Sequence, residues 1–80
     1  MTVAQAHYQR EIAVRQKIAT LYNMERKDIE KHGLRIVDTV PYNGTEPLSD
    51  HLIRYRGKTY FTLENLQYFP ETITLLEIAR

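Results

Sequence analysis

The chain of 80 residues contains no cysteine and no long apolar run. The absence of cysteine excludes disulfide bonds, thiolate chemistry and cysteine-based zinc sites, and it is compatible with a reducing compartment. No apolar stretch reaches the length that crosses a bilayer, and the first residues lack the apolar core of a signal peptide. We therefore expect a cytoplasmic protein with no membrane association.

The chain also lacks a strong net charge. Its 11 lysines and arginines nearly balance its 10 aspartates and glutamates, which gives a formal net charge of +1 at pH 7. This charge is too small to indicate a polyanionic partner for the whole molecule. Locally the charge is uneven, because residues 51–60 carry three cations and no acid, whereas residues 33–50 and 61–80 each carry three acids and one cation. With 42% hydrophobic and 26% charged residues, residues 1–80 are expected to form a single folded domain.

Glycine and proline are absent from residues 2–32, which are rich in good helix formers, and this predicts helix. Gly33 follows where a C-cap glycine is expected. The segment is compatible with one long helix or with two. Glu25 interrupts the apolar stripe, and Asn23 beside it tolerates the left-handed conformation that closes a turn. The apolar stripe joins four residues at helical spacing, Val14, Ile18, Leu21 and Ile29.

The second half of the chain alternates between strand and turn patterns. "LRIVDTV" (34–40) is alternating and β-branched, which predicts a strand, and "PYNGTEPLSD" (41–50) predicts a loop. "HLIRYRGKTYF" (51–61) predicts a β-hairpin around Gly57.

The last segments are expected to be helical. Thr62 can N-cap a short helix through "LENLQYF", which Pro70 would end. "ETITLLEIAR" (71–80) fits helix or strand, and we favour helix. The expected fold class is therefore α+β, with N-terminal helices, a strand, a β-hairpin and one or two short C-terminal helices.

Residues 17–33, "KIATLYNMERKDIEKHG", also fit a helix-turn-helix. Such a unit needs a small residue where its helices approach, a turn former, an apolar plug after the turn, and an apolar residue on the second helix. The residues that fill these places are Ile18, Ala19, Asn23, Met24 and Ile29.

A basic hairpin follows this unit, and the order resembles the excisionase-type and MerR-type winged helix-turn-helix domains. In those families a glycine-tipped basic wing leads into a helix that opens with an acidic pair and a leucine. Here the wing is "RYRGKTYF" and the helix opening is "TLENL", with Glu64, Asn65 and Leu66 in the matching places. The resemblance covers about Lys17 to Phe69, and it implies binding to double-stranded DNA. The second helix, "MERKDIEKH", is electrically neutral, so we expect modest affinity that cooperative or paired binding, such as a homodimer, would increase.

Eight residues are candidate DNA contacts under this hypothesis. Those on the second helix would reach base edges, those on the wing would contact phosphates, and two tyrosines could stack on bases. The ordinary alternatives are an exposed helix face with i,i+4 ion pairs, an exposed hairpin tip, and cross-strand packing of the tyrosines. The candidates are Arg26, Lys27, Lys31, Arg54, Tyr55, Arg56, Lys58 and Tyr60.

No pattern indicates an enzyme, a metal site or a cofactor. His7, His32 and His51 lack the spacing of metal ligands, and there is no nucleophile motif or glycine-rich phosphate loop. Two hypotheses remain. The first is a small winged helix-turn-helix protein of a phage or mobile element, acting in transcription or recombination. The second is a non-catalytic protein-interaction module with a host or self protein partner, such as a phage-encoded inhibitor or an accessory subunit of a larger assembly. In that case one long helix packs on a small sheet, and the six tyrosines form the contact surface.

Overall fold

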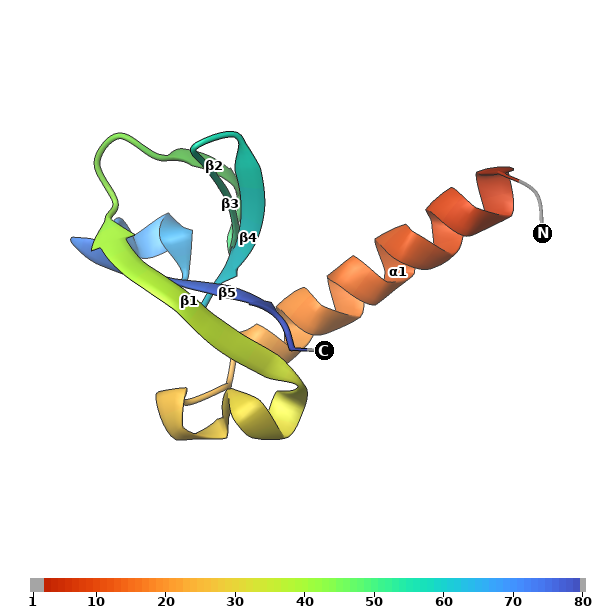
Figure 1. Ribbon diagram of the computed structural model, residues 1–80, viewed down its shortest axis with the longest axis horizontal. Helices are drawn as coiled ribbons and strands as arrows, with labels where there is room; N and C mark the ends of the chain where they lie inside the picture. The colour runs from red at the N-terminus through yellow and green to blue at the C-terminus, as the bar shows by residue number, and fades with distance from the viewer. Residues whose placement is uncertain (1–2, 80) are drawn as a thin grey trace.

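A computed structural model describes residues 3–79 of the chain, and the side chains of residues 11–79. The chain forms an α+β domain with one helix, α1 (Val3–Leu21), followed by a five-stranded antiparallel sheet (Figure 1). The strands are β1 (Leu34–Pro41), β2 (Glu46–Ser49), β3 (Leu52–Tyr55), β4 (Lys58–Thr62) and β5 (Thr72–Ile78). Three single turns of 3-10 helix complete the structure, η1 (Arg26–Asp28), η2 (Glu30–His32) and η3 (Leu66–Tyr68).

The sheet has the strand order β1-β5-β4-β3-β2. β2, β3 and β4 form a meander, and β5 then inserts between β4 and β1. β5 pairs with β1 along its whole length but meets β4 at only two residue pairs, Phe61 with Leu76 and Thr62 with Leu75. The short β4–β5 pairing joins the β1–β5 ribbon to the meander, and the two parts lie at an angle to each other in Figure 1.

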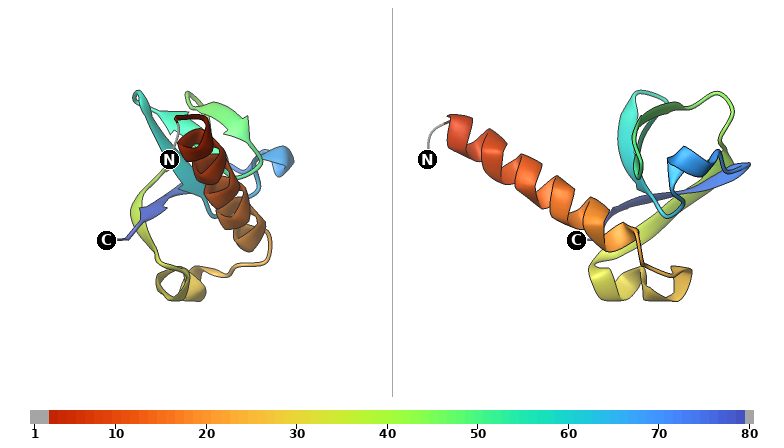
Figure 2. Two further views of the ribbon diagram at one scale, coloured as in Figure 1. Left: turned by 90° about the vertical axis from the view of Figure 1, so that its right-hand side faces the viewer. Right: turned by 180° about the vertical axis from the view of Figure 1, so that it is seen from behind.

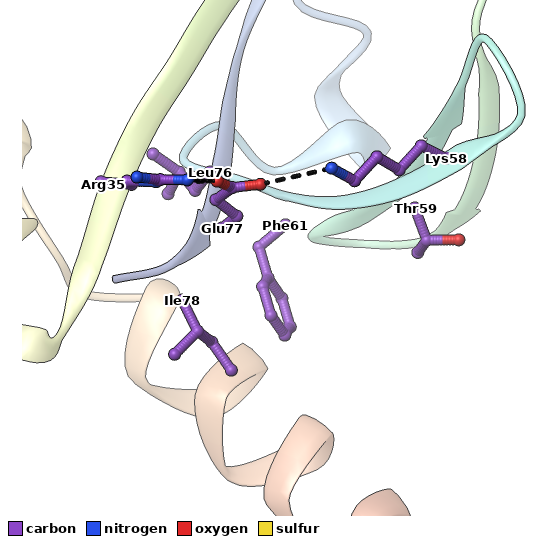
Figure 3. A pocket seen from close by; sticks show the side chains of 7 residues that line it. All are labelled: Arg35, Lys58, Thr59, Phe61, Leu76, Glu77 and Ile78. Atoms are coloured by element: carbon purple, nitrogen blue, oxygen red, sulfur yellow. Dashed lines mark hydrogen bonds and ion pairs between the residues drawn. The ribbon is translucent and has the colours of Figure 1, made fainter. Parts of the chain in front are cut away.

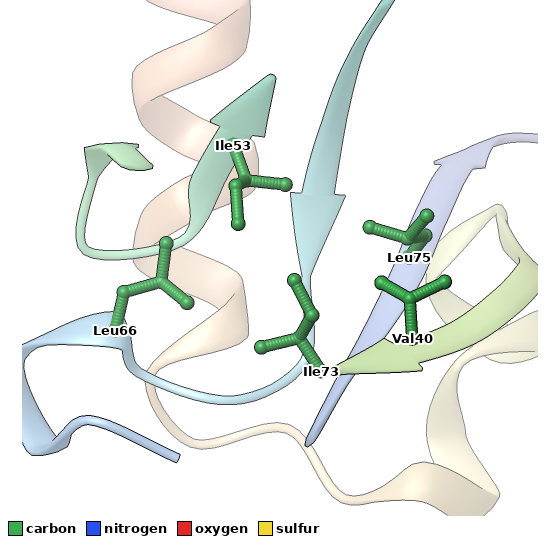
Figure 4. Close-up of a cluster of buried hydrophobic side chains, with 5 residues drawn as sticks. All are labelled: Val40, Ile53, Leu66, Ile73 and Leu75. Atoms are coloured by element: carbon green, nitrogen blue, oxygen red, sulfur yellow. The ribbon is translucent and has the colours of Figure 1, made fainter. Parts of the chain in front are cut away.

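Two apolar clusters form the core, and β5 contributes to both. The first cluster consists of Val40, Ile53, Leu66, Ile73 and Leu75 (Figure 4). The second consists of Leu21, Ile29, Leu34 and Leu76. β5 therefore buries both of its faces, as a strand in the middle of a sheet does, and its residues 73–76 are all buried.

The N-terminal part of α1 projects away from the sheet (Figures 1 and 2), whereas Ala13, Val14 and Lys17 border a pocket shared with the sheet. Leu21 is buried in the second cluster, and Lys17 Nζ donates a hydrogen bond of 2.8 Å to the His32 carbonyl in η2. Within the described residues, no helix has both the length and the apolar character needed to span a bilayer.

The expected helix-turn-helix is wrong. The break expected near Tyr22–Met24 is present, because α1 ends at Leu21, but no second α-helix follows. Residues 26–32 form η1 and η2 instead, and this arrangement buries Ile29 against Leu34 and Leu76. Gly33 has the expected closing role. It adopts the left-handed conformation (φ 72°), and the amide of Leu34 bonds to the Ile29 carbonyl at 3.1 Å, which satisfies carbonyls at the end of the turn.

The hairpin predicted around Gly57 is confirmed as β3 and β4, but it is not a free wing. It lies inside the sheet, between β2 and β5. The segment expected to be a loop contains β2, which pairs with β3 at the edge of the sheet.

The expected C-terminal helices are also wrong. Thr62 is the last residue of β4, and its hydroxyl donates to the Glu64 carbonyl at 2.8 Å instead of capping a helix. The cap is Asn65, whose side chain accepts from the Gln67 amide at 2.9 Å, and the helix is the single turn η3. Residues 72–78 form β5, because burial on both faces suits their β-branched and apolar side chains.

Candidate functional site

The basic residues considered for DNA binding lie in two separate groups. Arg26 and Lys27 lie in η1 and Lys31 in η2, whereas Arg54, Arg56 and Lys58 surround the β3–β4 turn. Among the described residues, no hydrogen bond or ion pair joins one group to the other. The two groups therefore do not form one continuous site through contacts of their own.

Acidic side chains of this chain pair with most of these cations. Lys27 Nζ lies 3.2 Å from Glu25, and Lys31 Nζ lies 3.7 Å from Asp28. On the hairpin, Arg54 lies 3.6 Å from Glu46 of β2. These pairs are largely solvent-exposed and individually weak, but they give three of the six cations an acidic partner.

The hairpin tyrosines support the sheet and hold cations over their rings. Tyr55 and Tyr60 are partly buried against the first core cluster, in line with the packing alternative. The Arg56 guanidinium lies 5.2 Å from the centre of the Tyr55 ring, and Lys58 Nζ lies 5.6 Å from that of Tyr60. Such cation–π contacts are favourable even when exposed.

Side chains from the N-terminal ends of β1 and β4, the two strands that flank β5, converge on one carboxylate of β5, Glu77 (Figure 3). Arg35 Nε donates to Glu77 at 2.7 Å from the paired position on β1, and Lys58 Nζ lies 3.7 Å away on the other side. The Arg35 hydrogen bond, assisted by the charge of Lys58, holds the pKa of Glu77 below its ordinary value. An open cavity of about 580 Å³ lies here, bordered by Phe61 and Ile78 among others. Its charged groups pair with each other, so the cavity is lined by an ion-pair network.

Within the described residues, no cluster of three or more His, Cys, Asp and Glu side chains could hold a metal ion. His51 is buried, and its Nδ1 lies 2.9 Å from the Thr62 carbonyl. That carbonyl accepts only, so Nδ1 carries the proton and His51 ties the β2–β3 turn to the end of β4. His51 therefore has a structural position in this fold.

A second surface, which the sequence pattern did not single out, lies around η3. Tyr68 and Phe69 are 80% and 78% exposed, although neighbouring Leu66 is buried in the first core cluster. Phe69 adopts a left-handed conformation (φ 49°), and its ring meets the Tyr42 ring edge-on with centres 6.4 Å apart.

The half-exposed Tyr22 extends this surface on the other side. Its hydroxyl donates a hydrogen bond to the Asp50 carboxylate, and its ring packs at 82° against buried His51, with centres 4.8 Å apart. The bond to Asp50 raises the pKa of Tyr22 above its ordinary 10.0, and the charges of Asp50 and Tyr68 add to this effect. We call Tyr22, Tyr42, Tyr68 and Phe69 the aromatic surface.

Sequence reasoning identified tyrosines as a contact surface in one hypothesis but did not select which ones. The adjacent aromatics of "QYFP" are visible in the sequence, but their exposure depends on the direction of η3. The pairing of Arg35 with Glu77, 42 residues away, had no local signal.

No protein-family model, curated protein or solved structure matches the chain. Function is therefore inferred from the side chains of the chain itself.

Proposed function

We propose that the chain is a non-catalytic protein-interaction module, and that the aromatic surface is its contact surface. The observation that carries the proposal is the pair Tyr68 and Phe69, each about four-fifths exposed and adjacent on one turn. Aromatic side chains supply much of the binding energy at interfaces, and contiguous exposed apolar surface marks interaction sites.

The turn that carries these aromatics is held from several directions. The Leu66 side chain is anchored in the core, and its amide donates to the Asp50 carbonyl at 2.7 Å. The Asn65 side chain caps the turn at Gln67, and Phe69 N–H closes it on the Leu66 carbonyl at 3.3 Å. A rigid turn loses little conformational entropy when its side chains enter a partner's pocket.

The DNA-binding hypothesis receives less support from the arrangement. A winged helix-turn-helix reads bases with its second helix, and residues 26–32 form only two short 3-10 turns. The hairpin cations are engaged by Glu46, by Glu77 and by two tyrosine rings. Phosphate contacts would have to compete with each of these interactions.

Site-specific photo-crosslinking in the cell of origin tests the proposal. The photoreactive residue p-benzoylphenylalanine replaces Phe69 in the full chain, and in a control it replaces Leu48, which is 42% exposed on β2. We expect one abundant crosslinked protein from position 69 and not from position 48. We also expect the double variant Tyr68→Ala/Phe69→Ala to lose affinity capture of that protein.

Two results would contradict the proposal. The first is the absence of a crosslink at position 69. The second is duplex DNA binding at low salt, in a fluorescence titration, that the variant Arg54→Ala/Arg56→Ala/Lys58→Ala abolishes.

A further inference from the structure

The two segments around the aromatic surface carry negative charge and no positive charge. No lysine or arginine occurs between Arg35 and Arg54, or between Lys58 and Arg80. Three of the four aromatic residues come from these segments, Tyr42 from the first and Tyr68 and Phe69 from the second. The acids of the two segments, leaving out Glu77 at the far end of β5, are Asp38, Glu46, Asp50, Glu64 and Glu71.

Two of these carboxylates border the aromatic surface. Asp50 accepts the Tyr22 hydroxyl, and its carbonyl receives the Leu66 amide, which places it beside η3. Glu71 lies two residues after Phe69, and its carbonyl accepts the Tyr42 amide at 2.9 Å. Within residues 11–79, no lysine or arginine forms an ion pair with either carboxylate. By contrast, Glu46 is paired with Arg54, and Glu64 is bonded to Thr74.

We propose that the aromatic surface binds a basic segment of a partner protein, with an arginine or lysine side chain stacked on Tyr68 or Phe69 between Asp50 and Glu71. This inference rests on the proposed function and names the chemistry of the partner. An aromatic face attracts cations because its quadrupole is negative there, and flanking carboxylates add a longer-range attraction.

The chain already uses the same chemistry internally. Two of its own tyrosines each hold a cation, Tyr55 with Arg56 and Tyr60 with Lys58. The exposed rings of Tyr68 and Phe69 hold no cation of this chain within the described residues, although the segments next to them carry Asp50 and Glu71. A planar guanidinium stacks and bonds to a carboxylate at once, so arginine is the better fit.

A titration of the isotope-labelled full chain with synthetic peptides, followed by NMR, tests the inference. The probes are short peptides of alternating arginine and serine, lysine and serine, and glutamate and serine. We expect the arginine peptide to shift the amide signals of residues 22, 42, 50, 66–69 and 71, the lysine peptide to bind more weakly, and the glutamate peptide not to bind. Binding is expected to weaken from low to physiological salt.

Charge-neutralising variants localise the effect. Asp50→Asn and Glu71→Gln should each weaken arginine-peptide binding about two- to fivefold, the size expected for an exposed charge pair. Asn at position 50 can still accept the Tyr22 hydroxyl, so the fold is retained. Glu30→Gln in η2 makes the same change of charge at the basic end, and it should leave binding unchanged.

The outcomes separate this inference from the proposed function. If position 69 crosslinks a partner but the arginine peptide does not bind, or binds equally to Tyr68→Ala/Phe69→Ala, the partner chemistry is wrong and the interaction module stands. If position 69 yields no crosslink, the interaction module itself fails. Concentration-dependent self-association that the variant Arg54→Ala/Arg56→Ala/Lys58→Ala abolishes would replace the partner protein by a second copy of this chain.

Discussion

The Glu64 side chain accepts hydrogen bonds from β5 on the side where β4 no longer pairs with β5. Among the partly exposed side chains, we expect the loss of Glu64 to lower the free energy of unfolding the most. Beyond Thr62 the chain leaves the sheet for η3, so β4 no longer faces residue 74 of β5. The Leu63 amide still bonds to the Thr74 carbonyl, but the buried Thr74 amide is taken by the Glu64 carboxylate at 2.6 Å. The second carboxylate oxygen accepts the Thr74 hydroxyl at 2.9 Å.

Glu64→Ala leaves both the Thr74 amide and the Thr74 hydroxyl without a partner in a buried place. Each orphaned group costs about 1–3 kcal/mol, so we expect a loss of about 2–6 kcal/mol in the free energy of unfolding. A domain of this size has about 4–12 kcal/mol in total at typical stability per residue. Glu64→Gln can accept from the amide and donate to the hydroxyl, so it should lose only about 1 kcal/mol, the charge-assisted part of the interaction.

Urea unfolding followed by far-ultraviolet circular dichroism measures these differences. Glu71→Ala is the matched control, because Glu71 is an exposed glutamate in the same connection and should change stability by no more than about 0.5 kcal/mol. If Glu64→Ala is as stable as Glu71→Ala, the carboxylate does not support β5 and the reasoning is refuted. If Glu64→Ala does not fold, Glu64→Gln still decides the question.

Three further predictions concern backbone strain and ionisation. Arg56 has a left-handed conformation (φ 51°) before Gly57 in the hairpin turn, and asparagine tolerates this conformation better than arginine does. Arg56→Asn should therefore raise the free energy of unfolding by about 0.5 kcal/mol, because the relief of backbone strain exceeds the loss of the cation–π contact with Tyr55. The lowered pKa of Glu77 means that its pairing with Arg35 stabilises the fold above the ordinary carboxyl pKa and is lost as pH falls through the folded-state pKa. Arg35→Ala should remove this acid-side dependence in unfolding measurements and raise the Glu77 pKa in an NMR titration. The pKa of Tyr22 is raised in the folded protein, so its hydrogen bond to Asp50 stabilises the fold below the ordinary tyrosine pKa. This stabilisation is lost as pH rises through the folded-state pKa of Tyr22. Asp50→Ala should lower the folded-state pKa of Tyr22 in a spectrophotometric titration.

Each of these predictions has a contrary result. A lower melting temperature for Arg56→Asn would mean that the arginine contact outweighs the strain. If Arg35→Ala leaves the fall in stability at low pH unchanged, the Arg35–Glu77 ion pair contributes nothing measurable to the free energy of unfolding. A Tyr22 titration that Asp50→Ala leaves unchanged would mean that the Asp50 carboxylate does not raise the pKa of Tyr22.

Local patterns predicted the elements whose cause is local. The lack of glycine and proline in the first part predicted helix, alternation predicted β1, and Gly57 predicted the hairpin. Gly33 has its expected role because its left-handed conformation is a property of the turn itself.

Elements whose cause is distant were missed. "ETITLLEIAR" does not keep its alternation past Leu75, because β5 is buried on both faces, and a short apolar run of this kind does not distinguish strand from helix. "MERKDIEKH" has helical composition, but burial of Ile29 against β1 and β5 favours two short turns. β2 lies in a segment rich in turn formers, where only pairing with β3 makes it a strand.

The same distinction applies to the candidate sites. The cations of the hairpin were visible in sequence, but their acidic partners, Glu46 and Glu77, come from other strands. Likewise, the count of tyrosines was known, but the direction of η3 decides that Tyr68 faces solvent while Tyr60 packs on the core.

The insertion of β5 between β1 and β4 sets an order for assembly. The meander β2–β3–β4 joins residues that are close in sequence, so it can form early and quickly. β1 has no strand partner other than β5, and the two are separated by the whole meander. Contacts this distant in sequence slow folding. The β1–β5 ribbon is therefore expected to close last, and until it does, Leu34, Leu76 and the end of α1 have no common core to pack in.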